Sequence, residues 1–102
     1  MYVGDLAKAV VFFIETKTKK YLINVGTKSD KTIKQYANFL RKIIHPECKI
    51  IFDNTKSDGT PRKLLNSNIA NKYGWRSKIT LLKGTLKTIE IFKKRFKIYD
   101  YD

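Results

Sequence analysis

The sequence Lys-Ser-Asp-Gly-Thr-Pro-Arg-Lys at residues 56–63 is the stretch on which the prediction of the fold rests. An Asp-Gly pair is typical of a tight turn, and Pro61 restricts the backbone just after it. Such a turn presents backbone N–H groups, and Arg62 and Lys63 place two positive charges beside them. Arginine can bind a phosphate through two parallel hydrogen bonds, whereas lysine acts as a mobile point charge. The stretch therefore favours a loop that holds a diphosphate, although an ordinary basic surface turn before a helix fits the same residues.

Apolar patterns on both sides of this loop predict short strands and helices. The runs Tyr21–Val25 and Lys49–Asp53 favour two strands, because they are rich in β-branched and aromatic residues. Apolar residues recurring every three or four positions favour helices elsewhere. The predicted helices cover residues 5–15, a stretch between Asp30 or Thr32 and Pro46, a stretch between Asn66 or Ser67 and Gly74, and residues from Thr80 to about Phe96. The expected N-terminal caps are Asp5 for the first helix, Asp30 or Thr32 for the second and Thr80 for the last.

The expected core draws on the last predicted helix and on the tryptophan. The apolar side chains expected to face inward on that helix are Leu82, Leu86, Ile89, Phe92 and Phe96. Trp75, directly after Gly74, is expected to act as a packing anchor. By contrast, Lys93, Lys94 and Arg95 are expected to be a solvated helix end.

The order of elements predicts an α/β fold in which helices surround two short strands. Two short strands cannot form an independent sheet, and the first helix has no preceding strand to pack on. The chain is therefore interpreted as the second half of a larger protein, with one apolar face left uncovered. We expect one domain over residues 1–98 and a frayed tail at residues 99–102.

Composition excludes several classes of protein. With 102 residues and 42% hydrophobic content, the chain can bury a core and is not a disordered tail. The longest uncharged apolar run, Ala9–Ile14, is far shorter than the roughly 20 residues that span a bilayer, so no membrane segment or membrane partner is expected. The start of the chain lacks the basic region of a signal peptide. One cysteine, Cys48, excludes an internal disulfide and a cysteine-cluster metal site, which favours the cytoplasm.

The net charge of +13 calls for an anionic partner or a compositional explanation. Phosphate-bearing ligands and nucleic acids are the usual partners of such chains. However, the 22 basic residues include only four arginines and are scattered through the chain, as expected from a genome biased toward A and T. We therefore do not expect a dedicated nucleic-acid surface.

Several short segments, in order, resemble the C-terminal part of the GDP-L-fucose synthase family, within the extended short-chain dehydrogenase/reductase superfamily. They are residues 23–27 (Ile-Asn-Val-Gly-Thr), 32–34 (Thr-Ile-Lys), 51–53 (Ile-Phe-Asp), 56–65 (Lys-Ser-Asp-Gly-Thr-Pro-Arg-Lys-Leu-Leu), 74–75 (Gly-Trp) and 79–81 (Ile-Thr-Leu). The Asp-Gly-Thr-Pro-Arg-Lys motif with Gly-Trp downstream is the most specific of these. Residues 1–7 also resemble a Tyr-Val-Asp-Asp-Leu-Ala segment of the family, with Gly4 where the first aspartate usually stands.

The resemblance implies a function and a set of site residues. The family converts GDP-4-keto-6-deoxymannose to GDP-L-fucose by epimerisation and NADPH-dependent reduction. Its members are homodimers with an N-terminal Rossmann domain for NADP and a smaller C-terminal substrate domain. By motif position, Asp58 and Lys63 match residues of the GDP-sugar site, and phosphate chemistry adds Arg62. The implied partners are a GDP-sugar and either a separately encoded Rossmann half or a second copy.

The catalytic groups of that family are missing from this sequence. No tyrosine is followed by a lysine four residues later, and no Gly-x-Gly-x-x-Gly turn is present. Cys48 and His45 lie in a helix-to-strand connection and do not match the family's epimerisation pair. We therefore assign no catalytic, cofactor or metal-binding residue, and we expect no bound NADP and no activity from the chain alone. The alternatives are a small basic nucleic-acid-binding protein and a non-functional gene remnant.

Overall fold

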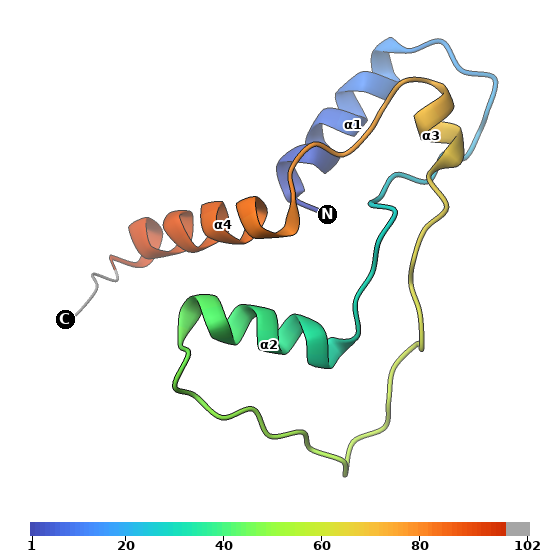
Figure 1. The fold of residues 1–102 in the computed structure, drawn as a ribbon. Coiled ribbons are helices and arrows are strands. Elements are labelled where there is room, and N and C mark those ends of the chain that lie inside the picture. Colours follow the sequence, from blue (N-terminus) through green and yellow to red (C-terminus); the bar gives the residue numbers. More distant parts are fainter. Residues whose placement is uncertain (98–102) are drawn as a thin grey trace. The chain divides into compact units, whose positions relative to one another are not determined.

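The computed structural model describes residues 1–97, which form four α-helices and no β-strand (Figure 1). The helices are α1 (Val3–Glu15), α2 (Ile33–Ile44), α3 (Asn68–Lys72) and α4 (Leu81–Phe96). The chain divides into two compact units, one made of Met1–Lys28 with the residues from Leu65 onward, the other of Ser29–Leu64. Helix α2 belongs to the second unit and the other helices belong to the first. The predicted tail at residues 99–102 lies outside the described residues.

Local capping signals place α2 and α4 where the sequence predicts them. Thr32 caps α2 by accepting a hydrogen bond from the Gln35 backbone N–H (3.1 Å), while the Gln35 side chain accepts one from the Thr32 N–H (2.9 Å). This reciprocal pair satisfies two backbone donors that a helix start otherwise leaves open. The Thr80 side chain caps α4 by accepting a hydrogen bond from the Lys83 backbone N–H at 3.3 Å. These two caps are confirmed.

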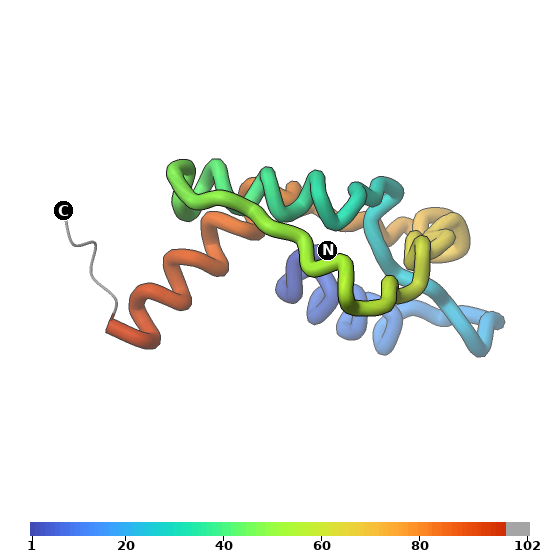
Figure 2. The backbone as a smooth tube through the Cα atoms, turned by 90° about the horizontal axis from the view of Figure 1, so that it is seen from below, coloured from blue at the N-terminus to red at the C-terminus, as the bar shows by residue number. Residues whose placement is uncertain are grey.

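The two predicted strands are wrong for the described residues. Tyr21–Val25 and Lys49–Asp53 run as uncoiled backbone, which Figure 2 shows, and no strand is assigned to either. They fall in different units, and a strand is stabilised by the backbone of a neighbouring strand rather than by its own residues. Ile51 is 89% exposed and Leu22 is 76% exposed. β-Branched composition therefore made these runs resemble strands, but the residues described provide no partner for either.

The carboxylate of Asp5 joins the start of α1 to the segment before α4. It was expected to cap α1, but the helix begins after Tyr2 and Asp5 lies inside its first turn. Asp5 is only 3% exposed. One of its oxygens, Oδ2, accepts hydrogen bonds from the backbone N–H groups of Lys78 and Ile79, each at 2.8 Å. The expectation of a cap was wrong because a buried carboxylate has stronger donors available from a distant segment than from its own helix.

Two glycines shape the first unit, one by its backbone conformation and one by letting a helix lie close to a neighbouring side chain. Gly74 has φ +100°, a left-handed conformation that favours glycine, and it ends the turn after α3 as expected. The chain then returns so that the Trp75 N–H donates to the Ala70 carbonyl at 3.0 Å. Gly84 is buried against the Tyr2 ring, where an added Cβ would lie 3.3 Å from the Tyr2 Cβ. The missing side chain therefore lets α4 approach the start of the chain.

The core of the first unit is small. Ala9, Ala70 and Trp75 are buried, which confirms Trp75 as a packing anchor. Four half-buried apolar side chains pack around them, namely Phe12, Phe13, Ile23 and Val25. The face of α4 that was expected to point inward is instead about half exposed at Leu82, Leu86, Phe92 and Phe96. The periodicity correctly places these residues on one face of one helix. It does not show which polypeptide segment covers that face.

We predict that Asp5→Ala lowers the free energy of unfolding by about 1–3 kcal/mol, because two backbone N–H groups lose their charged acceptor. Asp5→Asn should lower it less, since the amide oxygen still accepts. Urea unfolding followed by circular dichroism measures both. Glu15→Gln is the matched control, because it removes an exposed carboxylate from the other end of the same helix and should change stability by less than about 0.5 kcal/mol. Equal stability of Asp5→Ala and Glu15→Gln would contradict the role given to Asp5.

Candidate functional site

The candidate loop, residues 56–63, follows a turn built on Asp53 in the second unit. Oδ1 of Asp53 accepts hydrogen bonds from the Thr55 backbone N–H (3.0 Å) and from its hydroxyl (2.6 Å). These bonds, the hydroxyl bond foremost, lower the pKa of the Asp53 carboxyl. The turn therefore lies at residues 54–55, and the turn expected at Asp58 and Gly59 is not there. Asp53 takes its position because an aspartate readily binds backbone and side-chain donors two residues ahead.

Arg62 is held by a carboxylate from the far end of the same unit. Its Nε donates to Asp30 Oδ2 at 2.7 Å and its Nη2 to Asp30 Oδ1 at 3.3 Å. This side-on pairing uses one edge of the guanidinium and leaves its other N–H groups for a second anion. The hydrogen bond to Arg62 lowers the pKa of the Asp30 carboxyl, and the same bond raises the pKa of Arg62. The Arg62 side chain is still 69% exposed.

The structure does not link the other two predicted site residues to this ion pair. Asp58 and Lys63 are exposed on the same loop. Within residues 1–97, neither side chain makes a hydrogen bond or an ion pair. Asp58 is an acceptor available for hydroxyl groups, and Lys63 is a cation available for a phosphate. Their assignment to a site stays a prediction.

Asp30 is the residue of this region that the sequence did not single out for a site. It was considered only as a helix cap, and Thr32 takes that position. It stands 32 residues before Arg62, and no local pattern couples two residues at that separation. A search for carboxylates near the basic motif would not have found it, because the acidic residues nearest in sequence are Asp53 and Asp58.

The residues present do not fit a dinucleotide cofactor or a metal cluster. A dinucleotide is held where a glycine-rich turn leads from a strand into a helix whose first N–H groups are open. Among residues 1–97 no strand leads into any helix, so the strand–turn–helix unit that holds a dinucleotide is not formed by the described residues. No three histidine, cysteine or acidic residues gather into a cluster within residues 1–97. Cys48 is only partly exposed, and its N–H donates to the carbonyl of His45, the residue that ends α2.

No helix among the described residues has the length and apolarity needed to cross a membrane. Of the described helices, α4 is the longest, with 16 residues. Its last turn carries Lys93, Lys94 and Arg95, and the expected solvated helix end is confirmed at Lys94 and Arg95, which are exposed, whereas Lys93 is partly buried.

Comparison with curated proteins gives a consistent set of relatives. GDP-L-fucose synthase 1 of Arabidopsis thaliana is 34% identical over 94 residues, which is 92% of this chain and 29% of the relative. GDP-L-fucose synthase of Escherichia coli is 34% identical over 101 residues, covering 90% of this chain and 32% of the relative. GDP-L-colitose synthase of Yersinia pseudotuberculosis is 34% identical over 93 residues, which is 90% of this chain and 30% of the relative. No protein-family model and no solved structure matches the chain.

These relatives indicate the extended short-chain dehydrogenase/reductase superfamily. Within it, about nine tenths of the chain is similar to GDP-L-fucose synthases, and the match is consistent with the C-terminal part of those proteins. It spans less than a third of the length of the curated relatives it matches.

We predict that Arg62→Ala raises the pKa of Asp30 toward the ordinary value of an aspartate, because the main cause of its lowering is removed. Carbon NMR of the side-chain carboxyls during an acid titration measures this. Since the pKa of Asp30 is lowered, the ion pair is complete above the ordinary aspartate pKa and is lost as the pH falls through the lowered value.

Asp53 serves as the internal control of that titration. Its pKa is lowered by Thr55 and not by Arg62, so it should titrate identically in both proteins. An unchanged Asp30, or an equal shift of both carboxyls, would show that Arg62 does not hold Asp30 in solution.

Proposed function

We propose that this chain forms the GDP-sugar-binding part of a GDP-L-fucose synthase and that residues 56–63 contact the diphosphate. The substrate is GDP-4-keto-6-deoxymannose, which the enzyme family epimerises and reduces with NADPH. In this proposal Lys63 and Arg62 bind phosphate oxygens, and Asp58 accepts hydrogen bonds from sugar or ribose hydroxyls. The chain supplies binding, and the redox chemistry resides in polypeptide outside these residues.

The observation that carries the proposal is that the names of the relatives contain two different sugars, fucose and colitose, each attached to GDP. The chain matches GDP-L-fucose synthases and a GDP-L-colitose synthase with the same 34% identity and over nearly the same share of its length. Fucose and colitose differ, while GDP is common to both names. The shared chemistry of the matched region is therefore best explained by recognition of the nucleotide diphosphate.

Asp30 gives Arg62 a fixed orientation for this task. A free arginine on an exposed loop would have to lose side-chain freedom when it binds a phosphate. Asp30 already holds one edge of the guanidinium through Nε and Nη2. Its negative charge also weakens the attraction between Arg62 and an anion. Lys63, which has no carboxylate partner in residues 1–97, is therefore expected to contribute more to phosphate affinity than Arg62.

Reduction needs groups that this chain does not contain. The family uses a tyrosine with a lysine four residues later and a dinucleotide-binding turn, and neither motif occurs here. We propose that a separately encoded Rossmann-type polypeptide provides them and that NADP binds there, because a second copy of this chain would bring neither motif. The unpaired Cys48 supports a reducing compartment such as the cytoplasm.

We predict that GDP binds this chain more tightly than GMP, because the second phosphate gains contacts with the cations of residues 56–63. Isothermal titration calorimetry with each nucleotide measures the two affinities. Lys63→Ala should weaken GDP binding about tenfold, which corresponds to one lost charge-assisted hydrogen bond. Lys42→Ala is the matched control, since it removes the same charge from an exposed position of α2 in the same unit.

Two results would contradict this prediction. One is equal affinity of the chain for GDP and GMP, and the other is equal weakening by Lys63→Ala and Lys42→Ala. A single-stranded RNA that binds more tightly than GDP and loses affinity steeply with salt would favour the nucleic-acid alternative, because counterion release sets such a slope.

We predict that the chain alone does not oxidise NADPH with GDP-4-keto-6-deoxymannose. Activity should appear when it is mixed with the part of the Escherichia coli GDP-L-fucose synthase that precedes the matched region. The decrease of NADPH absorbance measures the reaction, and Lys63→Ala should reduce it while Lys42→Ala should not. NADPH oxidation by the chain alone would contradict the proposal. Absence of NADPH oxidation in every mixture would contradict a functioning split enzyme.

A further inference from the structure

We propose that Tyr21–Val25 is an acceptor segment for a β-strand supplied by an acidic polypeptide segment outside these 102 residues. The inference goes beyond the proposed function, because strand addition requires no nucleotide and concerns the other unit of the chain. It starts from the strand that the sequence predicts and the described structure does not form.

The acceptor segment already has the side-chain arrangement of a strand. Ile23 and Val25 are half-buried and pack against the core, whereas Leu22 and Asn24 are exposed. This alternation with a period of two is the pattern of a strand that covers a core with one face. The segment therefore already has the amphipathic pattern of a strand. What it lacks among the described residues is a neighbouring backbone to pair with.

The backbone of the acceptor segment is open. Within residues 1–97, no hydrogen bond joins a backbone N–H or C=O of residues 21–25 to any partner. The nearest bonds lie outside it, from Lys20 N–H to the Thr18 hydroxyl (3.0 Å) and from the Ser67 hydroxyl to the Gly26 carbonyl (3.2 Å). A row of unpaired donors and acceptors of this kind is a template for an added strand.

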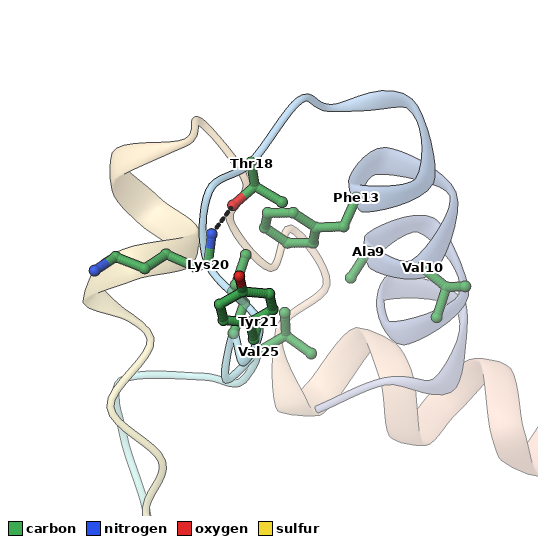
Figure 3. Close-up of a pocket in the computed structure, with 8 residues that line it drawn as sticks. Ala9, Val10, Phe13, Thr18, Lys20, Tyr21 and Val25 are labelled. Atoms are coloured by element: carbon green, nitrogen blue, oxygen red, sulfur yellow. Dashed lines mark hydrogen bonds between the residues drawn. The ribbon is translucent and has the colours of Figure 1, made fainter.

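A hollow beside the segment offers room for an apolar side chain of the incoming strand. It encloses about 300 Å³, and Figure 3 shows side chains from α1 and from the acceptor segment around it. Alternate residues of the segment, Tyr21, Ile23 and Val25, form one wall. The opposite wall is apolar and comes from α1, at Ala9, Val10 and Phe13.

Charge identifies the partner as acidic and disfavours a second copy of this chain. Lys17, Lys19 and Lys20 directly precede the acceptor segment, and Lys20 also lines the hollow. Two copies would each carry a net charge of +13 over the whole chain and would repel each other. A strand flanked by glutamate or aspartate is attracted instead. In the curated relatives more than two thirds of the polypeptide lies outside the matched region and is available to supply such a strand.

The test uses two synthetic peptides and amide hydrogen exchange of the full chain followed by mass spectrometry. The peptides are Glu-Val-Thr-Val-Thr-Val-Glu and its charge-reversed control, Lys-Val-Thr-Val-Thr-Val-Lys. At millimolar concentration, the acidic peptide should slow exchange at residues 21–25 by at least about tenfold, and the basic peptide should not. Titration with GDP in the same samples reports on residues 56–63, so failure of the strand proposal and failure of the nucleotide proposal are distinguishable.

Proline variants identify the backbone as the binding group. Successive N–H groups of a strand point to opposite edges, so Tyr21→Pro blocks one edge and Asn24→Pro the other. Neither replacement removes a hydrogen bond of the free chain, and both side chains are exposed. One of the two proline variants should abolish the protection, whereas Tyr21→Ala and Asn24→Ala should retain it.

Three outcomes would overturn the inference. The first is no protection of residues 21–25 by the acidic peptide, and the second is protection that survives both proline variants. The third is protection that rises with the concentration of the chain in the absence of peptide, which would show that a second copy is the partner.

Discussion

The first unit depends on one carboxylate. Asp5 is buried, and its Oδ2 accepts two backbone N–H groups from the segment before α4. Among the described residues, the apolar core of this unit consists of three buried side chains, so hydrophobic burial alone provides little to hold α1 against the segment before α4. Charge-assisted hydrogen bonds in a site shielded from water are stronger than neutral ones at the surface. Asp5 therefore compensates for a core that is too small to specify the arrangement by itself.

The second unit repeats this solution at its surface. Arg62 and Asp30, which are 32 positions apart, close a stretch that contains α2 and the turn at Asp53. The pair lies in water, where an ion pair contributes little to stability. Its consequence is geometric, because it fixes the direction of one guanidinium on a loop that has few other restraints. That use suits a ligand-binding loop, in which a side chain gains from being oriented before the ligand arrives.

The parts of the fold that the sequence predicts correctly are those decided within a few residues. Thr32 and Thr80 mark helix starts through hydrogen bonds three residues ahead, and Gly74 marks a helix end through its own backbone conformation. The prediction of two strands was wrong because a strand forms only beside a partner strand, and the pattern of one segment does not show whether a partner is present. Asp5 was interpreted as a helix cap and Asp30 as an alternative cap to Thr32, because the donors that they bind lie far away in the sequence. Asp58 and Lys63 were predicted as site residues from a family motif. Their role in binding stays a prediction, because it depends on contacts with a ligand.

The reach of the Asp5 hydrogen bonds also governs when this protein can fold. The bond to Lys78 joins residues separated by 73 positions, and the bond to Ile79 joins residues separated by 74. During synthesis the Asp5 carboxylate therefore stays hydrated until residues 78 and 79 have left the ribosome, so this contact of the first unit forms late. The second unit is one continuous stretch, Ser29–Leu64, and needs no such delay. The second unit is thus expected to acquire its structure before the Asp5 contact closes the first unit, although part of the first unit is synthesised earlier.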